Sequence, residues 1–322
     1  MEQPLSPKKT WINGILFVLT AFSIFFFGLT WSLNYVYAED LAKGVKIGPY
    51  LDVLLQPRIL GLSLVYAVAL LVILLGHEFG HYLMCRRYGL EASLPYFIPF
   101  PNLIGTFGAF IRIKSRITNK PYLFDIGAAG PLMSFLLSLP ALGIGLALSK
   151  PVPPLPTEGA LIFGEPLLFK LIGSLVMGDV PAGYDVAHHP LAIAGWVGIF
   201  VTSLNLFPIG QLDGGHIAYA VLGKRARNLS KAFIVFFFVM GIFFYMGWAV
   251  LAVVILFIGL KHPALADEEI PLSSGRMKLA ALAAVVFVLS FVPDPIRGYD
   301  GLTLFKSWLP SLKSAIEGLR LF

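Results

Sequence analysis

Two histidines and a glutamate, His77, Glu78 and His81, lie in a strongly apolar stretch of the sequence. They belong to "GHEFGHYL" (76–83), which follows the uncharged run "LGLSLVYAVALLVILL". A spacing of four residues places both imidazoles on one helical face, one turn apart, as two ligands of a tetrahedral Zn²⁺ require. Zinc lowers the pKa of bound water from about 15.7 to about 7, and Glu78 could act on this water as general base. Because ionisable groups inside an apolar helix are costly, the pattern predicts a functional site rather than a chance match.

A catalytic zinc site needs a third protein ligand and an open position. The best candidate is Asp213 in "NLFPIGQLDGGH" (205–216), with His216 as the competing ligand. We prefer Asp213 because Gly214 and Gly215 would let the backbone unwind and present the carboxylate.

The same stretch contains Asn205, a polar amide at the depth of an apolar span. An interhelical hydrogen bond would explain it, and so would a role in holding substrate or stabilising an oxyanion. Both interpretations stay open on the sequence alone.

The composition indicates a membrane protein that positions these residues on apolar helices. The chain has 322 residues, of which 57% are hydrophobic and 13% charged, and its mean hydropathy is +0.81. Soluble domains are about half apolar and about a quarter charged. The net charge of +6 comes from Lys and Arg beside the apolar runs, so it predicts membrane topology rather than a nucleic-acid partner. A single cysteine excludes an intramolecular disulfide and a Cys-rich metal site.

We expect an all-α polytopic membrane protein with about six transmembrane helices and a small membrane-associated β element. The first span would be an uncleaved signal anchor, and the fifth could be one tilted helix or a pair broken near Gly247. Prolines and glycines in 91–118, followed by the alternating "FGAFIRIKS" (107–115), predict a hairpin or re-entrant segment. The predicted spans are 11–37, 59–85, 122–148, 190–212, 232–260 and 278–293.

The distribution of basic residues sets the expected orientation. Loops on the N-terminal side are rich in Lys and Arg, whereas residues 150–188 are net acidic, so the N terminus is expected in the cytoplasm. Six spans would place the C terminus there too. This topology brings His77, His81 and Asp213 to the same, cytoplasmic leaflet.

These motifs resemble the site-2 protease family of intramembrane zinc metallopeptidases, peptidase family M50. The matching elements are H-E-x-x-H, "GPLMS" (130–134) and the N-x-x-P-x-x-x-x-D-G pattern that runs from Asn205 to Gly214. The resemblance implies one Zn²⁺ per chain held by His77, His81 and Asp213, with Glu78 as catalytic base. Through "NLIGTFGAFIRIKS" (102–115) and "HPLAIAGWVGIFVTSLN" (189–205) the chain is similar to a subgroup found in plastids and bacteria. Residues 38–58 and 150–188 are too short for the PDZ domain that many bacterial relatives insert, so none is expected.

The resemblance also implies an organisation in three parts. Residues 1–58 would form the signal-anchor span and an external loop, and residues 59–222 the three-helix catalytic core with the strand segment 91–118. Residues 223–322 would form two further spans and a cytoplasmic tail. The family motif often ends in Asn where this chain has Ser134, so a polar role at that position is not carried over.

The function predicted is zinc-dependent hydrolysis of peptide bonds within or next to transmembrane segments, with Glu78 as general base and Asn205 assisting. The substrate would be a transmembrane protein bound in extended form beside "FGAFIRIKS", and the location a bacterial inner (plasma) membrane. Two alternatives remain: a metal-ion transporter using the same His and Asp ligands, and a catalytically inactive membrane scaffold. A transporter would need polar residues along the whole pathway across the membrane.

Overall fold

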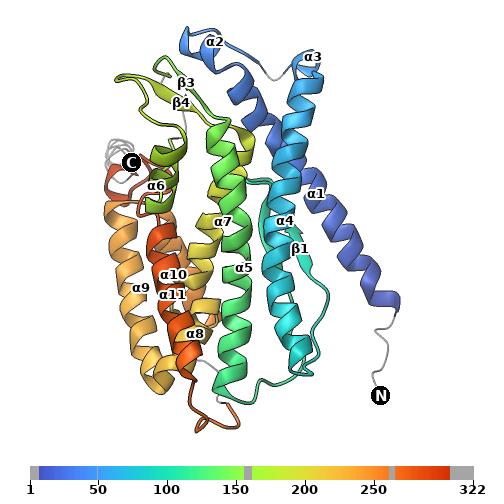
Figure 1. Ribbon diagram of the computed structural model, residues 1–322, viewed down its shortest axis with the longest axis vertical. Helices are drawn as coiled ribbons and strands as arrows, with labels where there is room; N and C mark the ends of the chain where they lie inside the picture. The colour runs from blue at the N-terminus through green and yellow to red at the C-terminus, as the bar shows by residue number, and fades with distance from the viewer. Residues whose placement is uncertain (1–6, 49, 156–161, 261–264, 305–322) are drawn as a thin grey trace, which may run out of the picture.

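The computed structural model describes residues 7–48, 50–155, 162–260 and 265–304. Most of these residues are helical, and the described strands form two small antiparallel sheets of two strands each (Figure 1). The helices are α1 (Pro7–Val36), α2 (Ala38–Ala42), α3 (Leu51–Leu54), α4 (Pro57–Arg87), α5 (Lys120–Ala147), α6 (Leu167–Val176), α7 (Pro190–Leu206), α8 (Asp213–Leu222), the 3₁₀ turn η1 (Gly223–Arg225), α9 (Ala226–Phe243), α10 (Gly247–Ile258) and α11 (Ser274–Ser290). The strands are β1 (Tyr96–Pro99), β2 (Thr106–Phe110), β3 (Lys150–Val152) and β4 (Asp185–Ala187).

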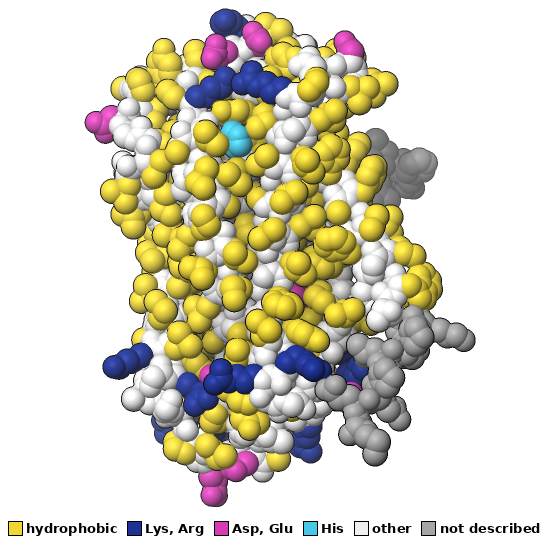
Figure 2. All heavy atoms as spheres, turned by 45° about the vertical axis from the view of Figure 1, so that its right-hand side comes forward, with side chains coloured by type: hydrophobic (Ala, Val, Ile, Leu, Met, Phe, Trp, Pro, Cys, Tyr) yellow, Lys and Arg dark blue, Asp and Glu magenta, His cyan; other side chains and the backbone are white. Residues whose placement is uncertain are grey.

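Four helical segments of the described chain are long and apolar enough to cross a membrane. They are Thr10–Val36, Pro57–Arg87, Lys120–Ala147 and Asp213–Phe243. The last segment is interrupted, because Gly223 (φ +59°) ends α8 and η1 leads into α9. The helices α6, α7 and α10 are apolar but shorter. On the face drawn in Figure 2, hydrophobic side chains fill a broad middle band and charged side chains gather toward the two ends, as expected for a chain that spans a bilayer.

The centre of the bundle consists of α4, α5 and α7, with α5 packed between the other two (Figure 1). Lipid tails are as apolar as leucine, so helices in a membrane associate through close packing rather than through removal of apolar surface from water. Gly195 of α7 shows this close approach, since a Cβ there would lie 2.6 Å from the backbone nitrogen of Leu142 on α5.

The β1–β2 hairpin is the observed form of the predicted segment 91–118. Strand β1 pairs antiparallel with β2, so that Tyr96 lies opposite Phe110. A backbone hydrogen bond from Ser93 to Arg112 extends the pairing toward the base. The regular strand β2 is shorter than the predicted 107–115 because its ladder ends at Phe110.

Helix α1 contacts this hairpin at its tip and at its base, and helix α4 contacts it at the tip. At the tip, the Trp31 indole donates a hydrogen bond to the Leu103 carbonyl, and the Tyr66 hydroxyl donates one to the Ile104 carbonyl, both at 3.1 Å. At the base, the Asn13 amide donates to the carbonyls of Leu94 (3.1 Å) and Pro95 (2.9 Å). The predicted hairpin is therefore present, and it lies along two apolar helices.

Residues 232–260 form a helical hairpin rather than one helix. Helix α9 ends at Phe243, and α10 begins at Gly247 and packs back against α9. The backbone of Gly259, just after α10, approaches Gly210 in the loop between α7 and α8. The break near Gly247 that the sequence left open is thus present.

The expectation that both termini lie on one side stays a prediction, because residues 305–322 are outside the described residues. Helices α1, α4, α5, α7, α9, α10 and α11 run along the length of the bundle (Figure 1). After α11, the carbonyl of Pro295 accepts a hydrogen bond from Gly164. Residues 292–304 therefore lie beside the loop between β3 and α6, at the end of the bundle opposite the start of α1; the rest of the C-terminal tail is outside the described residues. The sequence analysis missed the short sheet β3–β4 at this end.

Candidate metal centre

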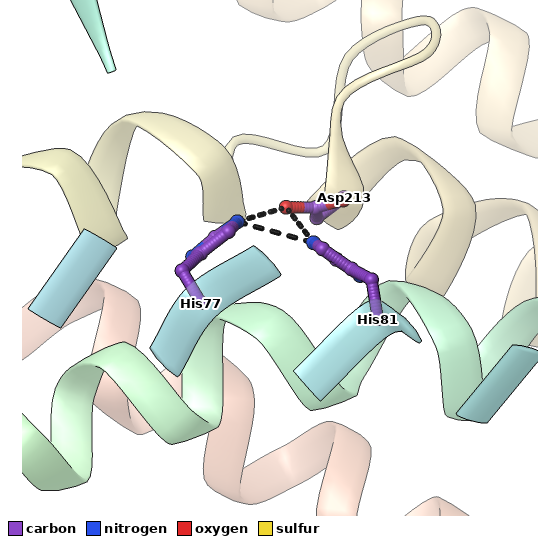
Figure 3. Close-up of side chains that lie close together, drawn as sticks. All are labelled: His77, His81 and Asp213. Carbon is purple, nitrogen blue, oxygen red and sulfur yellow. Dashed lines mark hydrogen bonds and ion pairs between the residues drawn. The ribbon is translucent and has the colours of Figure 1, made fainter. Parts of the chain in front are cut away.

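Three side chains from two helices converge at one point in the bundle. His77 and His81 extend from α4, and Asp213 is the first residue of α8 (Figure 3). The Nε2 atoms of the histidines lie 3.1 Å apart, and the Asp213 Oδ2 atom lies 3.2 Å from His77 Nε2 and 3.3 Å from His81 Nε2. The two histidines are buried, and Asp213 is partly buried.

The donor set fits a zinc ion. Zinc prefers nitrogen and oxygen ligands at about 2.0–2.2 Å in tetrahedral geometry, which corresponds to separations of about 3.3–3.5 Å between ligand atoms. The three measured separations are close to that range, and the three atoms point toward a common centre (Figure 3). Among the described residues, this is the group of His, Cys, Asp and Glu side chains that could hold a metal ion.

Helix α5 orients His81 through its backbone. The Nδ1 atom of His81 lies 2.7 Å from the Ile126 carbonyl oxygen, which can only accept a hydrogen bond. The proton is therefore on Nδ1, and Nε2 is left with its lone pair for a metal. The ring fits against α5 because residue 130 is glycine: a Cβ there would lie 2.1 Å from His81 Nε2.

His77 is oriented by hydroxyl groups. Its Nδ1 atom lies 3.1 Å from Ser134 Oγ, and Ser134 donates to the Pro131 carbonyl (3.0 Å). Thr202 of α7 lies 2.9 Å from Ser134 and donates to the Gly198 carbonyl. Because both hydroxyl protons have carbonyl acceptors, Ser134 Oγ can accept from His77 Nδ1–H, which leaves Nε2 free toward Asp213.

Asp213 reaches the histidines because α7 ends early. Helix α7 stops at Leu206, before Pro208, instead of continuing to residue 212 as predicted. The chain turns, and α8 begins at Asp213. The expected reason for the two glycines was wrong: α8 is helical there, and a Cβ on Gly214 would lie 2.1 Å from the Leu206 carbonyl oxygen. Close approach between α8 and the end of α7, rather than unwinding, requires glycine at this position.

The competing ligand His216 lies elsewhere on α8. It is not part of the group that converges on His77 and His81, and its Cβ faces Gly127 of α5. Of the other predicted site residues, Glu78 is buried on α4 and its carboxylate accepts a hydrogen bond from the backbone of Ile111, just after β2. The amide nitrogen of Asn205 lies 3.4 Å from His77 Nε2. The structure thus brings His77, Glu78, His81, Asn205 and Asp213 to one place.

Sequence reasoning did not identify the groups that orient the histidines. Ser134 was visible in "GPLMS", but the sequence did not show which side chain it meets. Thr202 lies in a mostly apolar run beside Ser203, with nothing to mark it as a partner of Ser134, and the Ile126 carbonyl is a backbone group that no residue type reveals.

Comparisons with known proteins give the chain its relatives. The model of the family described as "Peptidase family M50" matches residues 65–248. The chain is 35% identical over 236 residues to "Probable zinc metalloprotease EGY1, chloroplastic" of Oryza sativa subsp. japonica, which covers 68% of this chain and 40% of that protein. It is also 32% identical over 306 residues to the protein of the same name from Arabidopsis thaliana. That match covers 89% of this chain and 54% of the relative.

The chain spans about half or less of the length of these curated relatives. The matched segment contains every candidate site residue, from His77 to Asp213, and covers more than half of the chain. With the His–His–Asp cluster on apolar helices, this match settles the classification: the chain belongs to peptidase family M50.

Proposed function

We propose that the protein is an intramembrane zinc endopeptidase that hydrolyses peptide bonds within or next to transmembrane segments of membrane proteins. The observation that carries this proposal is the convergence of His77, His81 and Asp213, with Glu78 buried beside them, inside a bundle of apolar helices. Names of the relatives, which include the words zinc metalloprotease, support the same activity.

In this proposal His77, His81 and Asp213 hold one Zn²⁺ per chain. Zinc, when bound, supplies a Lewis acid that polarises a carbonyl and makes water a nucleophile near neutral pH. Glu78 takes the proton from the attacking water and passes it to the leaving amine. The backbone N–H of Ile111 donates to the Glu78 carboxylate and holds that side chain in one orientation.

Asn205 and the β1–β2 hairpin are proposed to hold the substrate. Asn205 lies beside the zinc-binding atom of His77, so its amide is within reach of a peptide carbonyl placed at the metal. A helical peptide bond is shielded by its own turn, so the substrate would bind extended and pair with the hairpin edge that leads to Ile111. Both groups act on a peptide, which favours a protein substrate.

The membrane arrangement is proposed as follows. The end of the bundle with the His–His–Asp cluster is proposed to face the cytoplasm, with about six spans in all. The division into residues 1–58, 59–222 and 223–322, with α4, α5 and α7–α8 as the catalytic core, is kept as a proposal. The sequence analysis expects a bacterial plasma membrane, whereas the relatives are chloroplastic by name; a multi-pass membrane location is common to both.

The alternatives predict different arrangements. A metal transporter would need further ligands along a path to the opposite face, but the described residues contain a single group that could hold a metal. An inactive scaffold would not need a buried glutamate next to that group. The protease proposal explains both features.

The test is cleavage by the purified full-length protein and its Glu78→Gln variant in liposomes. The probe is a fluorophore–quencher peptide with one apolar span and Asn-Pro near the cytoplasmic end of that span. We expect Glu78→Gln to lose cleavage by about 100- to 10,000-fold, because the general base is gone, while zinc content stays at one per chain. Glu91→Gln, at an exposed position, is the control and should cleave normally. Zinc uptake into liposomes without cleavage would instead support a transporter.

A further inference from the structure

The loop before α11 and the first turn of α11 contact the ends of α4 and α8, which carry the three candidate ligands, and of α5, which packs against both. We call these residues, 265–276, the strap. It passes beneath the ends of α4, α5 and α8, at the same end of the bundle as His81. Leu265 is buried at its start and packs in the core beside α5 and α8. The strap lies outside the segment matched by the family model.

The first connection joins the strap to α5 and α4. Arg276 forms a two-pronged pair with Asp125 of α5, through Nε to Oδ1 at 2.9 Å and through Nη2 to Oδ2 at 2.7 Å. Tyr88, just after α4, donates its hydroxyl to the same carboxylate. Burial and the Asp125 carboxylate raise the pKa of Tyr88, so its hydroxyl stays protonated and remains a donor. The Asp125 side chain is only 17% exposed, and the Arg276 guanidinium is the charged group paired with it at 2.7 Å.

This connection lies next to the group that orients His81. Asp125 is followed by Ile126, whose carbonyl holds the Nδ1 atom of His81. Tyr88 comes seven residues after His81, at the C-terminal end of the same helix, α4. Two links between α4 and α5, Tyr88–Asp125 and His81–Ile126, therefore fix both the rotation and the register of one helix against the other. Without Arg276, the Asp125 carboxylate in the Tyr88–Asp125 link would lose the guanidinium that pairs with it.

The second connection joins the strap to α8, the helix that supplies Asp213. Glu268 accepts a hydrogen bond of 2.7 Å from the Tyr219 hydroxyl, and Tyr219 lies six residues after Asp213. Next to Glu268, the N–H of Asp267 donates to the Thr118 carbonyl just before α5. One short segment thus holds α8 and α5 at a common position.

From this arrangement we propose that the strap positions the zinc ligands: Arg276, acting through Asp125 and the Ile126 carbonyl, aligns His81, and Glu268, acting through Tyr219, aligns Asp213. Both are positioning residues, since neither touches the metal centre. The inference rests on the proposed function for its catalytic consequence, but its effect on metal binding can be measured without any substrate. Groups that orient metal ligands typically contribute about 10- to 100-fold to metal affinity or activity.

The experiment compares Arg276→Gln, Arg276→Lys and Tyr219→Phe in the purified full-length protein. Lys278→Gln, an exposed position two residues further along α11, is the matched control. Three quantities are measured: zinc affinity by chelator competition, the visible spectrum of the cobalt-substituted protein, and kcat and KM for the liposome peptide described above. Tyr219→Phe removes one hydroxyl only, so it tests the proposal even if Arg276→Gln fails to fold.

We expect Arg276→Gln and Tyr219→Phe to weaken zinc binding about tenfold, to shift the cobalt spectrum, and to lower kcat with little change in KM. Arg276→Lys should recover part of the loss, because it restores the charge but not the two-pronged geometry. The proposal is overturned if the variants melt at lower temperature but keep the zinc affinity and cobalt spectrum of the unmodified protein. If the unmodified protein binds zinc but cleaves no peptide, the proposed function fails, and the zinc affinities still decide the inference about the strap.

Discussion

At the residue scale, the two histidines of the metal centre are oriented by partners of different chemistry. His81 faces a backbone carbonyl, which has no proton and can only accept. His77 faces Ser134, whose hydroxyl could donate or accept. The Ser134 proton goes to the Pro131 carbonyl, and the Thr202 proton goes to the Gly198 carbonyl. The Ser134 oxygen is therefore the acceptor for His77. The orientation of His77 therefore depends on two helices besides its own.

Replacement of Ser134 by alanine tests this arrangement. Ser134→Ala removes the acceptor for His77 Nδ1–H, and we expect zinc affinity to fall by about 10- to 100-fold, as for other groups that orient metal-bound histidines. Chelator competition on the purified protein measures the change. Ser138→Ala is the control: Ser138 is equally buried on α5, but its hydroxyl donates only to the Ser134 carbonyl. Equal zinc affinities in the two variants would contradict the role given to Ser134.

The site residues that could be found from the sequence are those with ionisable side chains. His77, Glu78, His81 and Asp213 could be found because ionisable groups are rare in apolar stretches. Backbone partners such as the Ile126 carbonyl could not, because they leave no mark on the sequence. Gly214 was noticed for the wrong reason, since the need for close packing appears only when Leu206 is placed beside it.

At the element scale, the long helices follow from hydropathy, whereas the turn between α9 and α10 does not. The run 232–260 is apolar throughout, so nothing local requires it to stop at Phe243. The turn is stabilised from a distance: Met246 N–H donates to the Tyr299 carbonyl, and the Trp248 indole donates to the Pro293 carbonyl. Helix starts with local side-chain caps, such as Asn119 before α5 and Ser273 before α11, are the ones a sequence can indicate.

The β1–β2 hairpin yields a prediction about substrate binding. Asn13→Ala removes the two hydrogen bonds from α1 to the carbonyls of Leu94 and Pro95, and each such bond contributes about 0.5–1.5 kcal/mol. We expect the hairpin base to loosen and KM for the liposome peptide to rise by about tenfold, while zinc content stays unchanged.

Asn34→Ala, at an exposed position on the same helix, is the matched control for α1. A loss of zinc in Asn13→Ala, or an unchanged KM, would show that the hairpin does not hold the substrate.

At the scale of the whole molecule, the two ends of the bundle have different chemistry. The metal centre and the strap occupy one end. Toward the other end lies a cavity of about 270 Å³ lined mainly by aromatic and aliphatic side chains, with His188 on its wall. The Nδ1 atom of His188 is buried and has no hydrogen-bond partner among the described residues. Burial lowers the pKa of His188 from 6.5 to about 4.

This buried imidazole predicts a loss of stability in acid. In the unfolded chain His188 takes up a proton below about pH 6.5, whereas in the folded protein it stays neutral down to about pH 4. Protonation therefore favours the unfolded state as the pH falls through this window, and the melting temperature in detergent should fall with it. In His188→Phe, which keeps a ring against Phe169, the fall should be smaller. An identical fall in both proteins would exclude His188 as a cause.

The family model matches residues 65–248, yet two parts of the chain beyond this segment touch the catalytic region. Helix α1 holds the hairpin that reaches Glu78, and Arg276 supports the carbonyl behind His81. A fragment cut at the limits of family similarity would keep His77, His81 and Asp213 and lose the contacts that α1 and the strap make on either side of them. Substitutions confined to these flanking parts can therefore alter the surroundings of the metal centre while its three candidate ligands stay the same.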